Sequence, residues 1–168
     1  PQFNQWFSDI RKSIVSVANG HALHITSANS YLSLGQGNVL DVAFQVDMNL
    51  SSGIASIGVR HSGAGYYRVA FNANGTISLY RTDQILASIV TSPFIAGQWR
   101  TVKLSVNGNI LRVAIDNTEV LNFTDTVPLP SGTMFVAGNV ETVNDFLLDN
   151  LIVQGTIAQS QMQSSTTF

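Results

Sequence analysis

The sequence predicts an all-β fold, a two-sheet antiparallel jelly-roll sandwich. Apolar and polar residues alternate with a period of two in most segments, which is the pattern of half-buried strands. Turn residues such as Gly, Asn and Asp recur about every 8–12 residues between these segments, and almost no segment has helical periodicity. Many short strands with regularly spaced turns are typical of a sandwich.

The clearest pattern is a three-stranded meander over Gln98–Phe123. Its first strand alternates apolar residues with Thr101, Lys103 and Ser105. Asn107-Gly108 follows and predicts a type I′ hairpin, in which both central residues have positive φ. Asp116-Asn117 predicts the second turn. The inward-facing residues of the first strand are Val102, Leu104 and Val106.

The remaining strands are predicted in order from the same alternation. Gly35 and Gly37 predict the end of the strand Ser30–Leu34. The first 13 residues are interpreted as an irregular segment or edge strand, with a short helix over Ser8–Ser13 as the alternative. The predicted strands are Ala22–Thr26, Ser30–Leu34, Val39–Leu50, Ile54–His61, Tyr66–Asn72, Thr76–Arg81, Ile85–Val90, Thr133–Gly138 and Phe146–Val153.

Length and composition narrow the class of protein. The 168 residues suffice for one core, so we expect a single domain over residues 1–155 and a polar tail or linker over 156–168. Charged residues make up 11% and the net charge is −2, which does not suit a nucleic-acid partner. No apolar run approaches the ~18 residues of a membrane span, so no membrane insertion is expected. A polar surface of Ser, Thr, Asn and Gln favours an extracellular or cell-surface protein.

Several runs of residues resemble the concanavalin A-like lectin/glucanase superfamily. They are Gly97–Gly108, Leu111–Asp116, Gly132 and Phe146–Val153, and the resemblance covers about residues 39–155. The chain is most similar to the laminin-G-like and carbohydrate-binding-module-like branch. The resemblance implies a jelly-roll fold, but this fold carries lectins, binding modules, hydrolases, lyases and structural adhesins.

The carboxylates argue against a hydrolase. Glucanases of the superfamily use paired Glu residues on one strand, whereas the two glutamates here, Glu119 and Glu141, lie on separate segments. A lyase of this fold would need Arg, His or Gln, and Tyr on one sheet face. The stretch from Arg60 to Arg68 has these residue types, but Arg60 and His61 face opposite ways in a regular strand. We therefore predict a protein that is not an enzyme, with a polysaccharide lyase as an alternative.

A ligand-binding face is predicted instead on the strands between residues 54 and 81. Alternation places Arg60, Tyr66, Arg68, Ser78 and Tyr80 opposite the apolar face. Aromatic rings stack on sugars, and Arg and Ser address hydroxyls or carboxylates, so we expect a glycan or polysaccharide partner. A solvated β-surface with cross-strand Tyr–Arg pairs is the alternative. Trp99 is interpreted as a core residue rather than as part of a sugar platform.

The resemblance also implies a structural calcium ion. In related domains an Asp at the position of Asp149 helps to hold Ca²⁺ against the N-terminal segment, where Asn4 or Asp9 would supply further oxygens. The alternative is that Asp149 only satisfies a neighbouring turn.

The sequence thus predicts a non-catalytic extracellular module for carbohydrate binding or adhesion in a larger surface or secreted protein. Contacts with neighbouring domains would then be expected. A self-associating subunit of a surface assembly or filament is the alternative of a different class.

Overall fold

The computed structural model describes residues 12–17 and 20–157 and is all-β in that part of the chain. All neighbouring strands pair antiparallel. Its strands are β1 (Lys12–Val17), β2 (Gly20–Ile25), β3 (Tyr31–Ser52), β4 (Ile54–Ser62), β5 (Gly65–Asn72), β6 (Thr76–Arg81), β7 (Gln84–Val90), β8 (Arg100–Asn107), β9 (Ile110–Ile115), β10 (Thr118–Thr124), β11 (Gly132–Gly138) and β12 (Asp145–Ile157).

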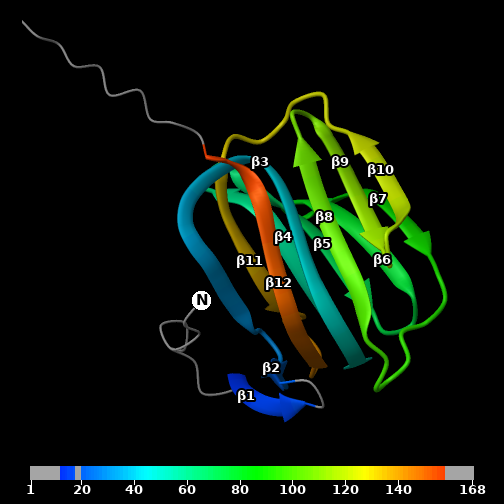
Figure 1. Cartoon of the computed structure of the whole chain (residues 1–168). Coiled ribbons are helices and arrows are strands. Elements are labelled where there is room, and N and C mark those ends of the chain that lie inside the picture. Colours follow the sequence, from blue (N-terminus) through cyan, green and yellow to red (C-terminus); the bar gives the residue numbers. More distant parts are fainter. Residues whose placement is uncertain (1–11, 18–19, 158–168) are drawn as a thin grey trace, which may run out of the picture.

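The strands form two packed layers, and β3 belongs to both (Figure 1). The first part of β3 pairs with β11, which continues through β4, β5 and β6 to β7; we call this the back layer. The second part of β3 pairs with β8 and β12, and with β9, β10, β2 and β1 these form the front layer. This arrangement confirms the predicted jelly-roll sandwich.

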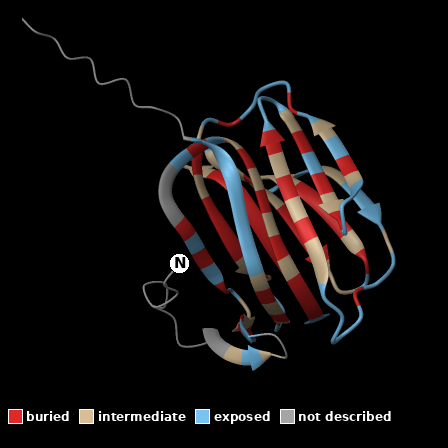
Figure 2. Cartoon of the chain, in the orientation of Figure 1, coloured by how far each residue is buried: buried red, intermediate tan, exposed pale blue. Residues whose placement is uncertain are grey.

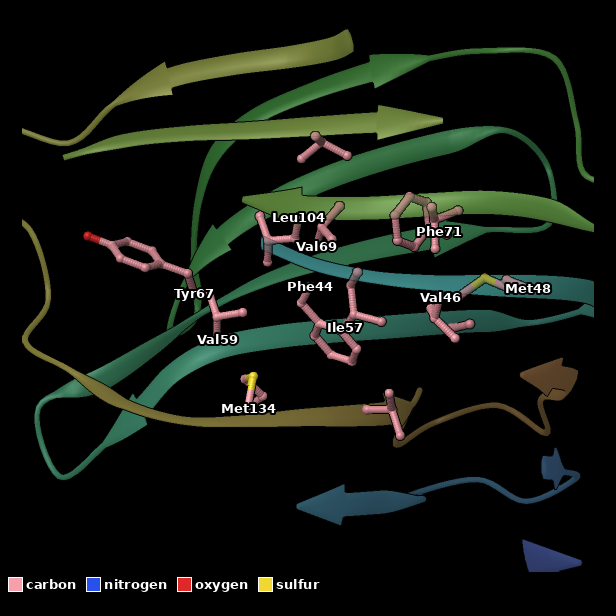
Figure 3. Close-up of a cluster of buried hydrophobic side chains, with 14 of the residues drawn as sticks. Phe44, Val46, Met48, Ile57, Val59, Tyr67, Val69, Phe71, Leu104 and Met134 are labelled. Atoms are coloured by element: carbon pink, nitrogen blue, oxygen red, sulfur yellow. The ribbon is translucent and has the colours of Figure 1, made fainter. Parts of the chain in front are cut away.

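The core lies between the layers, because each strand turns its apolar residues inward. Figure 3 shows Phe44, Val46 and Leu104 of the front layer facing Ile57 and Val69 of the back layer. All five side chains are fully buried. In Figure 2 buried and more exposed residues alternate along the strands, as the period-two pattern predicts.

Two local predictions differ from the structure. The predicted strands on either side of Gly35 are one continuous strand, β3, because that strand passes from one layer to the other. Lys12 and Ser13 lie in the edge strand β1 rather than in a helix, which agrees with the edge-strand interpretation, and residues 1–11 lie outside the described residues. The hairpin after β8 has Gly108 and Asn109 as its two loop residues, with Gly108 at φ 58°, so the turn lies one residue later than predicted.

The second turn of the meander lies at Asp116-Asn117, as predicted. Ile115 pairs with Thr118, which leaves Asp116 and Asn117 as the loop, with φ of 49° and 64°. Two positive φ values are characteristic of a type I′ turn. Among the described residues there is no helix that could cross a membrane.

Candidate functional site

The candidate site is the outer face of the back layer, on the side away from the core. On β5, Tyr67, Val69 and Phe71 are fully buried in the core, so Tyr66 and Arg68 lie on the outer face. The register extends this face across the layer. One row of paired residues runs Ser33, Phe135, Gly58, Arg68, Tyr80 and Ile85, and the next runs Tyr31, Ala137, Ser56, Ala70, Ser78 and Ser88.

Four rings form a cluster at one end of this face, centred on Phe135. Its ring centroid lies 5.3 Å from that of Tyr31, 5.5 Å from His61 and 5.4 Å from Tyr66. The Phe135 ring covers Gly58, where an added Cβ would lie 2.2 Å from two ring atoms. Because Gly58 has no side chain, the Phe135 ring packs directly against the sheet and forms the floor of the cluster.

His61 is held within the cluster by Tyr31. The Tyr31 hydroxyl lies 3.0 Å from His61 Nδ1, and the two ring centroids are 5.9 Å apart. His61 also meets Tyr66 edge to face, with centroids 5.7 Å apart. Burial raises the pKa of the Tyr31 hydroxyl above its usual range.

Arg68 and Tyr80 form a second element of the face, beside the cluster. The Arg68 guanidinium carbon lies 4.4 Å from the centroid of the Tyr80 ring, in a cation–π contact. The neighbouring Ser78 has a different role, because its Oγ lies 2.9 Å from Ser88 Oγ and the side chain is 9% exposed. Arg68 and Tyr80 can therefore contact a ligand more readily than Ser78.

The cluster and Arg68 border a shallow depression of about 230 Å³. Its walls combine aromatic rings, small residues and a few polar groups, which is the composition of a small-ligand site. None of the described residues that line it carries a carboxylate. The lining residues are Asn29, Ser30, Tyr31, His61, Tyr66, Arg68, Phe135, Ala137, Gly138 and Val140.

Arg60 does not lie on this face, contrary to the prediction. It has φ 53°, and the register of β4 with β5 shifts between Val59 and Ser62, so a β-bulge reverses the alternation. The side chain is 1% exposed; its Nε donates to Leu40 O at 2.7 Å and its Nη1 to Leu129 O at 2.9 Å. Burial lowers the pKa of Arg60. His61, rather than Arg60, joins Tyr66 on the outer face.

Trp99 is also placed differently from the prediction, since it is 38% exposed. The inward-facing residues of β8 are the even-numbered Val102, Leu104 and Val106. Because side chains alternate between the two faces, the odd-numbered position 99 falls on the outward side. The strand itself begins one residue later, at Arg100.

Asp149, the predicted calcium ligand, lies opposite Asp47 in the pairing of β12 with β3. Its Oδ1 accepts a hydrogen bond from Asn150 N at 2.7 Å, and Asp47 accepts bonds from Thr101 Oγ1 and Asn150 Nδ2. Within residues 12–17 and 20–157, no group of three or more His, Cys, Asp or Glu side chains could hold a metal ion. The predicted partners Asn4 and Asp9 lie outside the described residues.

Sequence reasoning missed Tyr31 and Phe135 as members of the site, and it did not assign His61 to the binding face. The alternation of Thr133–Gly138 contains a signal for Phe135, because Met134 and Val136 are its apolar inward neighbours. Tyr31 alternates in the same way with Leu32. Their closeness to β4 depends on pairing between strands far apart in the chain, which alternation does not reveal.

Comparison with known proteins gives structural likeness only. No protein-family model matches the sequence, and no curated protein matches it significantly. The carbohydrate-binding module CBM66 from Bacillus subtilis superposes with a TM-score of 0.70 at 12% identity, covering 89% of this chain and 95% of that one. The alginate lyase AlgAT5 of polysaccharide lyase family 7 gives 0.66 at 14% identity, over 93% and 87%.

A third solved structure is the exoplasmic/lumenal domain of VIP36 in its Ca²⁺/Man-bound form, with a TM-score of 0.63 at 12% identity, over 94% of this chain and 85% of that one. These likenesses agree with the observed two-layer architecture. The chain has the concanavalin A-like, lectin-type jelly-roll fold.

Proposed function

We propose that this chain is a non-catalytic carbohydrate-binding module that binds glycans on the outer face of its back layer. The observation that carries the proposal is the grouping of the Tyr31, His61, Tyr66 and Phe135 rings beside the stacked Arg68–Tyr80 pair. CBM66 and VIP36, described as a carbohydrate-binding module and as a Man-bound domain, support it through their shared fold.

The chemistry of the face suits a sugar. Pyranose rings have apolar C–H faces and polar edges, so they are bound by aromatic rings combined with a few hydrogen-bonding groups. Tyr66 and Tyr80 are partly exposed and supply ring surface, while Arg68 and His61 supply polar atoms at the edge. The depression is shallow, which suits one or a few units of a longer chain rather than an enclosed small molecule.

A glycan array with two site variants tests the proposal. We expect the wild-type protein to bind at least one class of glycan, and Tyr66→Ala and Tyr80→Ala each to weaken that binding by roughly ten-fold or more. Trp99→Ala is the matched control, because it removes an exposed aromatic residue elsewhere, and it should leave binding unchanged. An array on which the wild-type protein binds nothing would refute the function.

A polysaccharide lyase is the second candidate, favoured by His61, Tyr66 and Arg68 on the rim of one depression. A lyase removes the proton α to a uronate carboxylate and protonates the leaving oxygen, so it needs a base, an acid and a cation together. Incubation with uronate polymers distinguishes a lyase from a non-catalytic module. A lyase would release a product whose new double bond absorbs ultraviolet light.

The location of the module is part of the proposal. The sparse charge and the abundance of uncharged polar residues favour an extracellular or cell-surface protein, where the module would direct a larger protein to a glycan. Exposure of the native protein on intact cells to a protease that does not enter them would test this location.

A further inference from the structure

Arg68 differs from the other arginines that the structure describes in its lack of a described carboxylate partner. Within residues 12–17 and 20–157 there are five arginines, and only Arg68 has no ion pair with a described residue. Its positive charge is therefore uncompensated by the part of the chain that the structure describes. The pairs of the other four are Arg60–Asp41 at 3.4 Å, Arg81–Asp125 at 3.3 Å, Arg100–Asp116 at 2.7 Å and Arg112–Glu119 at 3.3 Å.

Two buried polar atoms on the same face lack hydrogen bonds. Among the described side chains, Arg68 Nε and Ser56 Oγ are the buried N and O atoms with no partner. Ser56 is 1% exposed and lies on β4 two residues from Gly58, the direct partner of Arg68 on β5. Buried polar groups in native proteins are nearly always satisfied, so these two atoms mark Arg68 and its neighbour Ser56 as incompletely hydrogen-bonded in the face without a ligand.

The surroundings of Arg68 favour an anion as its ligand. Stacking on Tyr80 holds the guanidinium in one place, which reduces the entropy lost when a ligand binds. In the part of the chain that the structure describes, no carboxylate lines the adjoining depression, although the full sequence has a net charge of −2. The positive charge is thus local to the face and is not a general property of the surface.

We propose that the ligand is an acidic glycan, whose oxyanion group accepts hydrogen bonds from the Arg68 guanidinium. This inference rests on the proposed function and names its ligand class. The oxyanion is a carboxylate, as in a uronic acid, or a sulfate ester, since both accept the charge-assisted hydrogen bonds of arginine. Tyr66, which lines the same depression, contacts the sugar ring.

Matched acidic and neutral oligosaccharides test the inference. The probes are uronate oligomers, the same oligomers after reduction of their carboxyl groups, and sulfated galactan oligomers with their desulfated forms. We expect wild-type affinity for an acidic probe to exceed that for its neutral form by roughly ten-fold or more, and the difference to shrink at high salt. The arm that shows the difference identifies carboxylate or sulfate as the source.

Three variants test whether the preference for acidic probes depends on Arg68. Arg68→Gln should abolish the preference for acidic probes, whereas Arg112→Gln, the same change of charge on β9 of the front layer, should retain it. Arg68→Lys keeps the positive charge but loses the planar stacking on Tyr80, so it should retain a reduced preference for acidic probes. If Arg68→Gln does not fold, the wild-type comparison of acidic and neutral probes still decides.

The outcomes distinguish a failure of this inference from a failure of the proposed function. Equal binding of acidic and neutral probes, or tighter binding of neutral ones, would overturn the acidic ligand and leave carbohydrate binding intact. An acidic preference that survives in Arg68→Gln would overturn the role of Arg68. Binding of no glycan of either kind would refute the proposed function, and the inference with it.

Discussion

The ring of Phe135 lies across Gly58, its cross-strand partner, so closely that a methyl group on Gly58 would lie 2.2 Å from two ring atoms. Phe135 is only 3% exposed, although it lies on the outer face of the sheet. The missing side chain of Gly58 therefore lets an aromatic residue form the floor of the candidate site.

Gly58→Ala should displace that floor. Only the far edge of the Phe135 ring opposes the new methyl group, so the ring can swing outward and the free energy of unfolding should fall by about 1 kcal/mol. Glycan affinity should fall more, because the rings of Tyr31, His61 and Tyr66 all pack on Phe135. Urea unfolding and glycan titration of the same variant measure both effects. Unchanged glycan affinity would show that Phe135 does not shape the site.

Tyr67→Phe should change how stability depends on pH. Tyr67 Oη donates to Asp125 Oδ2 at 2.6 Å and accepts from Leu129 N at 2.9 Å, and burial, helped by the bond to Asp125, raises its pKa to about 12. Between about pH 10 and pH 12 the phenol ionises in the unfolded chain but not in the folded one. The free energy of unfolding should therefore fall with rising pH in this window, and fall less in the variant.

Unfolding of both proteins at about pH 9 and about pH 11 gives the comparison. The difference between wild type and variant isolates Tyr67 from the other groups that titrate there, including Tyr31, whose pKa is also raised. Parallel pH profiles would contradict the assignment.

Arg60→Ala should destabilise the fold through lost internal hydrogen bonds. Arg60 donates to two backbone carbonyls, those of Leu40 and Leu129, from a side chain that is 1% exposed. Loss of a buried partner leaves each carbonyl unsatisfied, so we expect the free energy of unfolding to fall by about 3 kcal/mol or more. Arg112→Ala, at a half-exposed arginine on β9, should change it by less than about 0.5 kcal/mol. A small effect at Arg60 would mean that this side chain is not a structural anchor.

Calcium remains a prediction from the family resemblance. If Asp149 helps to hold Ca²⁺, adding Ca²⁺ to protein treated with EDTA should raise Tm, because an ion that binds only the folded state stabilises it. Asp149→Asn should remove the rise, and Asp83→Asn, an exposed position in the turn between β6 and β7, should not. The same Tm with and without Ca²⁺ would exclude a structural ion.

The sequence predicted the fold well where neighbouring strands follow one another in the chain. Alternation on β5 separated Tyr66 and Arg68 from the buried Tyr67 and Val69, and the turn at Asp116 was placed correctly. These features depend on local chemistry, namely a period of two and residues that tolerate positive φ. The turn at Gly108 was displaced by one residue, because Asn-Gly and Gly-Asn are both good hairpin loops.

The candidate site was predicted only in part. A bulge with positive φ at Arg60 reversed the alternation, which moved Arg60 into the interior and brought His61 to the outer face. Arg rarely adopts positive φ, so the residue type at position 60 gave no sequence signal for the bulge. The place of Phe135 beside Gly58 depends on the pairing of β11 with β4, more than 70 residues apart in the chain.

Amide chemical shifts recorded during titration with the strongest glycan from the array test the central claim most directly. We predict the largest shifts at the outer face of the back layer, at His61, Tyr66 and Arg68 and at their neighbour Phe135. The outward residues of the front layer, such as Thr101 and Lys103, should shift little. Shifts concentrated on β8, β9 and β10, or no saturable shifts at all, would contradict glycan binding at this site.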